Sequence, residues 1–176
     1  MGITIHYRFR VRSRDVALRL LSGAKAVAVR LGMKVMQERE MMLVLHPHPG
    51  CESINLHFRQ WKEVKAAKEW DYCRESMQDF EKVLRNDDFV CADFTKTQYA
   101  GFKTHVIVAE FLRRIAGSCS LAYVSDEADY YETREAEKAA GNFEENAEMI
   151  RKVGDFLKEK FGDENVYSAI DGVEGE

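Results

Sequence analysis

Residues 3–11 read ITIHYRFRV, and this stretch decides the fold. Apolar side chains recur at every second position, which is the period of a β-strand with one buried face. The apolar face holds Ile3, Ile5, Tyr7, Phe9 and Val11, and the polar face holds Thr4, His6, Arg8 and Arg10. The sequence therefore predicts a half-buried strand near the start of the chain.

A hairpin is expected at 41–46 and 53–58, because Pro49-Gly50 between these two runs suits the centre of a turn. Pairing about that centre places residue 44 opposite residue 55, and the strand period of two then assigns every side chain to a face. One face is wholly apolar: Met41, Leu43, Leu45, Ile54, Leu56 and Phe58. This wholly apolar face supports the register in which residue 44 lies opposite residue 55.

The remaining elements alternate between helical and strand periodicity. The expected helices are 14–31, 76–85, 95–116 and 143–161, and the further expected strands are 33–37, 89–94 and 121–124. Ser13 should cap the first helix, and Thr95 with Gln98 should form a capping box for the third. The apolar run at 121–124 is typical of a central strand. The order β-α-β-β-β-α-β-α-β-α predicts an α+β domain, with a single mainly antiparallel sheet and helices packed on one face.

The chain has 176 residues, of which 45% are hydrophobic, and this size and composition suit one globular domain. We expect the domain to span 1–162 and the acidic segment 163–176 to form a loose tail. No apolar run approaches the roughly 20 residues that cross a bilayer, so a membrane protein is not expected. The start lacks the apolar run of a signal peptide, and the four cysteines form no CxxC pair. Reduced thiols in a cytoplasmic protein are therefore expected.

Charge is distributed unevenly along the chain. Residues 1–36 hold eight basic and one acidic side chain, a net of +7, whereas residues 126–176 hold six basic and sixteen acidic, a net of −10. The two ends are expected to meet, within one chain or across a homodimer. Nucleic acid is not the expected partner, because the sequence pI is about 5.8. The aromatic residues of the first strand, Tyr7 and Phe9, also point away from its arginines.

The turn of the predicted hairpin carries potential metal ligands. His46, His48 and Cys51 fall on one face of the hairpin, and imidazole nitrogen and thiolate sulfur are ligands that suit zinc. The alternative is a rigid turn made by the prolines and the glycine, with both histidines exposed.

An acidic loop follows the strand expected at 121–124. Asp126, Glu127 and Asp129 could bind a divalent metal ion through oxygen, or crowding could raise the pKa of one carboxyl so that it serves as a general acid. The alternative is a solvated loop leading into a helix capped by Thr133. Tyr130 and Tyr131 within this loop need either a surface to pack on or a ligand.

A third candidate lies at the start of the helix expected at 95–116. Lys96 and free backbone N–H groups there could hold a phosphate or carboxylate, with His105 nearby. The alternative is that Thr95 and neighbouring polar residues only cap the helix, and that His105 is partly buried beside its apolar stripe.

Two functions of different class remain open. The first is a cytosolic binding or interaction module of unknown ligand, self-associating through its basic N-terminal and acidic C-terminal surfaces. The second is a small metal-assisted hydrolase centred on loop 126–132, with His105 or the turn histidines as further ligand or base. The absence of a recognisable catalytic motif favours the first. Convergence of 46–52, 95–105 and 126–132 in one pocket would favour the second.

Overall fold

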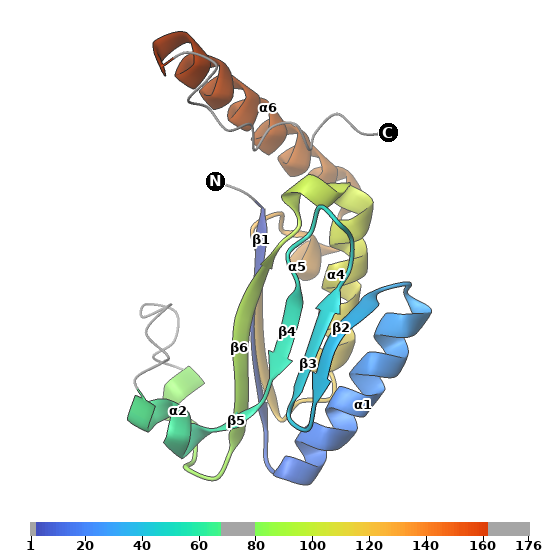
Figure 1. The fold of residues 1–176 in the computed structure, drawn as a ribbon, viewed down its shortest axis with the longest axis vertical. Helices are drawn as coiled ribbons and strands as arrows, with labels where there is room; N and C mark the ends of the chain where they lie inside the picture. The colour runs from blue at the N-terminus through green and yellow to red at the C-terminus, as the bar shows by residue number, and fades with distance from the viewer. Residues whose placement is uncertain (1–2, 68–79, 162–176) are drawn as a thin grey trace.

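A computed structural model of the chain describes residues 3–67 and 80–161 and has an α+β fold, as predicted (Figure 1). Its strands form two antiparallel sheets, one of four strands and one of three, rather than one continuous sheet. None of the helices in these two ranges combines the length and apolar character needed to cross a bilayer.

The larger sheet has the strand order β5-β6-β1-β7. Its members are β5 (Arg59–Gln60), β6 (Phe89–Lys96), β1 (Thr4–Val11) and β7 (Leu121–Asp126). The first strand is central and antiparallel to both neighbours, so that Phe9 lies opposite Cys91 on one side and Ala122 on the other. Helix α4 (Gly101–Ala116) connects the two flanking strands in a split β-α-β arrangement. The prediction of a central strand at 121–124 is wrong, because β7 lies at the edge of this sheet.

The core forms on the apolar face of β1, as the alternation predicts. Ile5, Tyr7, Phe9 and Val11 are fully buried, and they belong to one cluster with α4 and α1 (Arg14–Arg30). Ser13 caps α1 by accepting a hydrogen bond from the Val16 backbone N–H at 3.3 Å.

The smaller sheet holds β2 (Lys34–Arg39), β3 (Met42–His46) and β4 (Ile54–His57). The predicted hairpin register is confirmed, since Val44 lies opposite Asn55 and Leu43 opposite Leu56. Five of the six predicted apolar-face residues are buried, and Met41 is partly buried against them. Directly after β4 the chain enters β5, which pairs with β6. This change of partner near Phe58 explains why the strands divide between two sheets.

The expected helix at 95–116 begins later than predicted. Thr95 and Lys96 extend β6 by pairing with Ile5 and Thr4, and a 3-10 turn (Gln98–Ala100) precedes α4. Gly101 starts α4 at a φ of 77°, a backbone conformation that favours glycine. The predicted capping box is therefore wrong, because its first residue, Thr95, pairs with Ile5 within the sheet.

Two short helices follow the edge strands of the larger sheet, and the second of them contacts α4. Helix α2 (Trp61–Ala67) follows β5, and α5 (Tyr130–Thr133) follows β7. Of the expected helix at 76–85, residues 76–79 lie outside the described residues and residues 80–82 are helical, and the expected tail at 163–176 lies outside the described residues.

The last helix, α6 (Ala136–Phe161), is 26 residues long and begins seven residues earlier than predicted. Ala139 and Phe143 anchor its first turns in a small buried cluster with Ile3 and Ala128. Figure 1 shows the rest of α6 projecting away from the body, at the end of the sheet where β1 begins. The described part of the chain therefore consists of a packed body from which α6 protrudes.

Candidate functional site

The three segments singled out in the sequence meet near one end of the larger sheet. The hairpin turn contacts the end of β6, where the Glu52 backbone N–H donates to the Lys96 carbonyl at 3.0 Å. The Thr95 hydroxyl donates to the Glu52 carbonyl at 2.9 Å. The segment after β6 in turn contacts the acidic loop. Segment 95–105 therefore connects the hairpin turn with loop 126–132.

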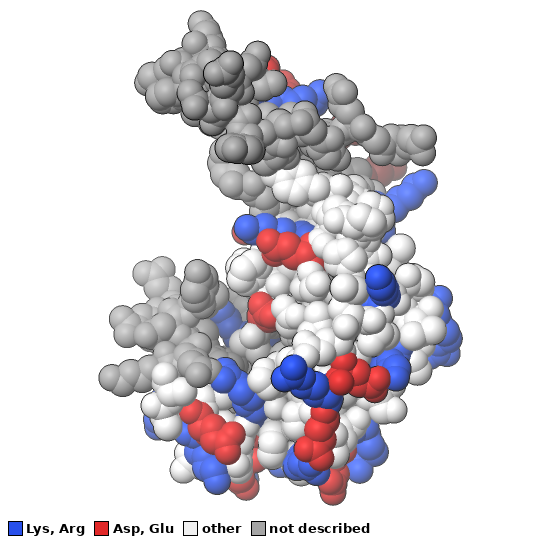
Figure 2. Space-filling model, in the orientation of Figure 1, with Lys and Arg blue, Asp and Glu red and all other residues white. Residues whose placement is uncertain are grey.

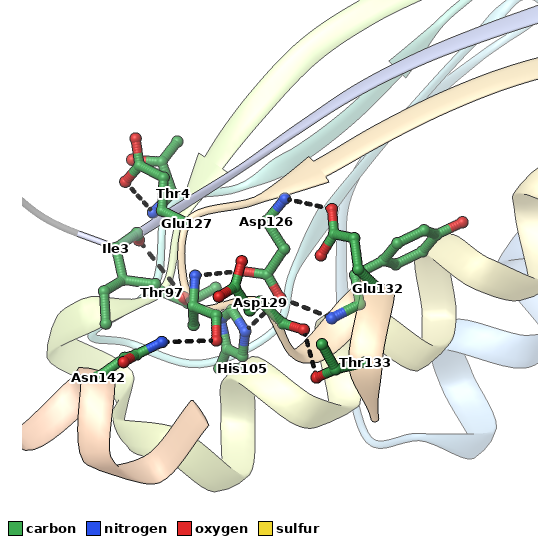
Figure 3. Close-up of polar contacts among 12 residues, drawn as sticks. Ile3, Thr4, Thr97, His105, Asp126, Glu127, Asp129, Glu132, Thr133 and Asn142 are labelled. Carbon is green, nitrogen blue, oxygen red and sulfur yellow. Dashed lines mark hydrogen bonds and ion pairs between the residues drawn. The ribbon is translucent and has the colours of Figure 1, made fainter. Parts of the chain in front are cut away.

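A buried chain of polar side chains makes the second connection (Figure 3). Thr97 Oγ1 lies 2.8 Å from Nδ1 of His105, and His105 Nε2 lies 2.9 Å from Oδ2 of Asp126. Thr97 and His105 are fully buried, and Asp126 is 4% exposed. Because a carboxylate only accepts, Nε2 donates to Asp126, and in the neutral imidazole Nδ1 then accepts from the Thr97 hydroxyl.

Asp126 also organises the backbone of its own loop. Its Oδ1 accepts from the Ala128 backbone N–H at 2.8 Å, and its Oδ2 accepts from the Tyr131 backbone N–H at 2.9 Å. Its own N–H donates to the Glu132 carboxylate at 3.1 Å. The carboxylate therefore receives three hydrogen bonds in a buried setting, which is typical of a side chain that holds a loop in place.

The remaining acidic side chains of the loop turn toward different partners (Figure 3). Glu127 Oε2 accepts from the Thr4 backbone N–H at 2.9 Å, and Asp129 Oδ2 pairs with the Lys138 ammonium at 3.0 Å. Within residues 3–67 and 80–161, no group of three His, Cys, Asp or Glu side chains is placed to hold a metal ion. The predicted ligands Asp126, Glu127 and Asp129 therefore do not converge on one coordination point.

The predicted zinc ligands of the hairpin turn also face different surroundings. The exposed His48 uses its Nδ1 to accept from the Gly50 backbone N–H at 3.1 Å, and His46 is partly exposed in β3. Cys51 turns inward and is 4% exposed, with its Sγ 3.7 Å from the Thr95 hydroxyl. Burial raises the pKa of Cys51 to about 11, which opposes the thiolate form that zinc requires.

The two tyrosines of the loop pack on the protein itself. Tyr130 meets Phe102 edge-to-face at 6.2 Å between ring centroids and meets His105 at 6.4 Å. The Arg113 guanidinium lies 4.5 Å from the ring centroid of Tyr131, a distance that allows a cation–π contact. Burial raises the pKa of Tyr131, and Arg113 acts in the opposite direction. Helix α4 thus provides the packing surface that was one of the two expectations for Tyr130 and Tyr131.

Thr97 belongs to the buried chain, although its position next to the expected helix start predicts only a helix cap. A lone threonine after a strand carries no periodic signal, and its role depends on the later start of α4. The order Thr-His-Asp is that of a nucleophile, a base and an orienting acid. The Thr97 hydroxyl is fully buried, however. The hydrogen-bonded series Thr97, His105 and Asp126 therefore connects three segments of the fold and does not present a nucleophile to a substrate.

The outer face of the larger sheet carries aromatic residues that the pattern of the first strand does not predict. Strand pairing places Phe94 beside His6 and Tyr123 beside Arg8. The rings of His6 and Phe94 are 5.8 Å apart, and the Arg8 guanidinium lies 5.2 Å from the Tyr123 ring centroid. Both aromatic rings therefore already contact basic side chains of the same chain. Only strand pairing could have identified them, since neither belongs to the first strand.

A groove of about 610 Å³ lies between the end of the larger sheet and the first half of α6. Its lining is polar and comes from several elements: Thr4, Lys96, Glu127, Asn142, Glu145 and Asn146. Met149 borders the groove at the next turn of the helix. The predicted ligand-binding residue Lys96 thus lies in a concave surface, whereas His105 is buried behind it.

Basic side chains of the N-terminal segment pair with acids from the middle of the chain. Arg10 lies 2.9 Å from Asp88, Lys25 lies 2.6 Å from Glu38, and Arg14 pairs with Glu40. On the face shown in Figure 2, acidic and basic side chains are correspondingly interspersed over the lower body. These contacts differ from the expected pairing between the two ends of the chain.

Comparison of the chain with known protein families, curated proteins and solved structures found no match. Function is therefore inferred from the chemistry and geometry of the protein's own residues.

Proposed function

We propose that this protein is a cytosolic interaction module that forms a homodimer by antiparallel pairing of α6. The observation that supports this proposal is an apolar stripe on the projecting half of the helix. Met149, Val153 and Phe156 recur at intervals of four and three residues, which places them on one helix face. They are 51%, 40% and 57% exposed, and contiguous exposed apolar side chains are typical of interaction surfaces.

The distribution of charge along α6 favours a second copy as the partner. Residues 136–150 contain four acidic and one basic residue, a net of −3, and residues 151–160 contain two acidic and four basic residues, a net of +2. Antiparallel pairing sets the acidic half of each helix against the basic half of the other. Parallel pairing would set like charge against like charge, which is unfavourable.

The dimensions of α6 are compatible with such a pair. A helix of 26 residues is about 39 Å long at a rise of about 1.5 Å per residue. Pairing about a centre between residues 152 and 153 sets Met149 of each copy opposite Phe156 of the other. A two-fold axis at that point makes the interface self-complementary and leaves the two bodies at opposite ends of the helix pair.

This arrangement assigns the charge complementarity to α6 itself. It does not require the basic N-terminal surface, where Arg10, Arg14 and Lys25 have partners within the chain. Tyr130 and Tyr131 likewise pack on the protein and are not needed for association.

Sedimentation velocity of the full chain tests the proposal. At low salt the protein should sediment with twice the chain mass of 20.3 kDa, and the dimer should dissociate more readily as salt screens the charge contacts. Met149→Glu and Val153→Glu should each give monomers, because a carboxylate would be buried in the stripe. A wild-type protein that stays monomeric at all concentrations and salt conditions would refute the proposal.

A matched control uses another exposed apolar residue on a helix. Val29 is 57% exposed on α1, so Val29→Glu should leave the dimer intact. If the dimer persists in the Met149→Glu and Val153→Glu variants, or if Val29→Glu disrupts it equally, α6 is not the interface.

A further inference from the structure

The groove between the larger sheet and α6 is a concave surface with polar groups of both charges. The groove has a volume of about 610 Å³, within the roughly 300–1,000 Å³ of ligand pockets, but it is open to solvent and more polar than most of them. It involves the sheet end and the α6 residues Asn142, Glu145 and Asn146, and it borders the apolar stripe of the proposed dimer at Met149.

Three residues form a row across the ends of three strands. Lys96 on β6 lies opposite Thr4 on β1, and the Glu127 backbone N–H donates to the Thr4 carbonyl at 3.1 Å. Neighbouring strands are about 4.8 Å apart, so the backbones at Lys96 and Glu127 are separated by about 10 Å. A positive and a negative side chain thus flank a hydroxyl side chain along one edge of the groove.

The opposite side of the groove is supplied by α6. Asn142 and Asn146 are four residues apart and therefore lie on one helix face, with Glu145 beside them. The Asn142 side chain donates to the Ala128 carbonyl at 3.1 Å, which fixes this face against the acidic loop (Figure 3). Side-chain amides both donate and accept hydrogen bonds, as peptide backbone groups do.

We infer that this groove binds a short zwitterionic peptide of two or three residues. Its carboxylate pairs with Lys96, and its ammonium group pairs with Glu127 and Glu145. Its backbone amide groups face Asn142 and Asn146. A peptide of three residues spans at most about 10 Å, which matches the separation between the charged residues of the row.

The charges of the groove select against other small ligands. Two carboxylates and one ammonium group repel polyanions such as nucleotides, because each added negative charge would face Glu127 or Glu145. Lys96 also has a neighbouring carboxylate, Glu52, at 3.9 Å, with both side chains 48% exposed. Such an exposed pair is weak, so a ligand carboxylate can compete for the ammonium group.

Titration of the full-length protein with triglycine, followed by backbone amide NMR, tests the inference. Resonances of Lys96, Glu127 and Asn146 should shift and saturate. N-acetyl-triglycine lacks the ammonium group, and triglycinamide lacks the carboxylate. Each should bind about tenfold more weakly, because one charge-assisted contact is lost.

Variants separate recognition from nonspecific effects. Lys96→Gln and Glu127→Gln should each weaken triglycine binding about tenfold. The control Lys65→Gln should leave it unchanged, since Lys65 lies on α2 near the opposite end of the sheet (Figure 1). None of these residues lies on the α6 stripe, so loss of peptide binding and loss of dimerisation are distinguishable by sedimentation of the same variants.

Three outcomes would overturn the inference. The first is the absence of saturable shifts with triglycine. The second is equal binding of N-acetyl-triglycinamide, which carries neither terminal charge. The third is equal affinity for glycine alone, which would show that the length of the row plays no part in recognition.

Discussion

Replacement of Asp126 by Asn tests whether the buried polar chain holds the end of the sheet together. The substitution preserves the size of the side chain, so it creates no cavity. It converts one acceptor oxygen into an NH₂ donor. Oδ1 receives the Ala128 N–H, and Oδ2 receives both His105 Nε2 and the Tyr131 N–H. Either orientation of the new amide therefore sets its NH₂ group against at least one N–H donor.

The expected decrease in the free energy of unfolding follows from these three hydrogen bonds. One buried donor left without an acceptor costs about 1–3 kcal/mol. The remaining bonds change from charge-assisted to neutral and lose about half their strength. The lower cost of burying a neutral amide offsets part of this loss. We expect Asp126→Asn to lower the free energy of unfolding by about 3 kcal/mol. For a chain of this length, that corresponds to a fall in Tm of about 6–12 °C.

Urea unfolding followed by circular dichroism measures this change, and Asp129 provides a matched control. Asp129 lies in the same loop, but it pairs with Lys138 at the surface and both side chains are 50% exposed. Asn also tolerates the left-handed backbone of this position, where φ is 63°. Asp129→Asn should therefore cost less than about 1 kcal/mol. Equal costs for the two variants would refute the assignment of Asp126 as the residue that organises the loop.

Two further predictions concern the packing of the hairpin turn and the buried thiols. A Cβ at Gly50 would lie 2.8 Å from the Tyr99 carbonyl carbon, so Gly50→Ala should destabilise the fold by about 2 kcal/mol. Gly141 has open space around it in α6, and Gly141→Ala should instead stabilise by about 0.5–1 kcal/mol; thermal unfolding that ranks the two variants the other way would contradict this packing. Burial raises the thiol pKa of Cys51 to about 11, from an ordinary value of 9.0. A pKa raised in the folded state contributes stability that is complete below the unfolded pKa and is lost as pH rises through the folded pKa, so stability measured by urea unfolding under reducing conditions should fall between about pH 9 and 11. The Cys51→Ser variant should lose less stability across this range, and an identical pH profile for variant and wild type would exclude the thiol as the cause.

The parts of the fold that the sequence predicts are those set by local periodicity. Alternation in 3–11 identifies β1 and its buried face, and the turn at Pro49-Gly50 yields the hairpin register residue by residue. The start of α4 is different, because the polar groups of Thr95 can either cap a helix or join a strand. Its backbone pairs with Ile5, which lies 90 residues earlier in the sequence, so no local pattern contains this contact.

The candidate site is predicted only in part for the same reason. The hairpin turn, the acidic loop and the start of α4 are recognisable from residue types. Segment 95–105 contacts both of the others, but the groove is lined by Lys96 and Glu127 and by no residue of 46–52. Their side-chain directions are not predictable, because each carboxylate of the loop is oriented by a backbone group or side chain of another segment. Glu127, for example, is held by the backbone of Thr4, which lies 123 residues earlier. A cluster of acidic residues in sequence thus becomes a set of separate contacts in space.

The buried polar chain also explains how the proposed groove and the proposed dimer helix are held in position. Asp126 fixes the backbone of Ala128, and the Ala128 carbonyl accepts from Asn142 near the base of α6. Ala128 also packs with Phe143 in the cluster that anchors this helix. The direction in which α6 leaves the body therefore depends on the buried carboxylate of Asp126. Loss of that carboxylate should loosen the groove wall and the base of the protruding helix together, even though the apolar stripe of α6 itself is unchanged.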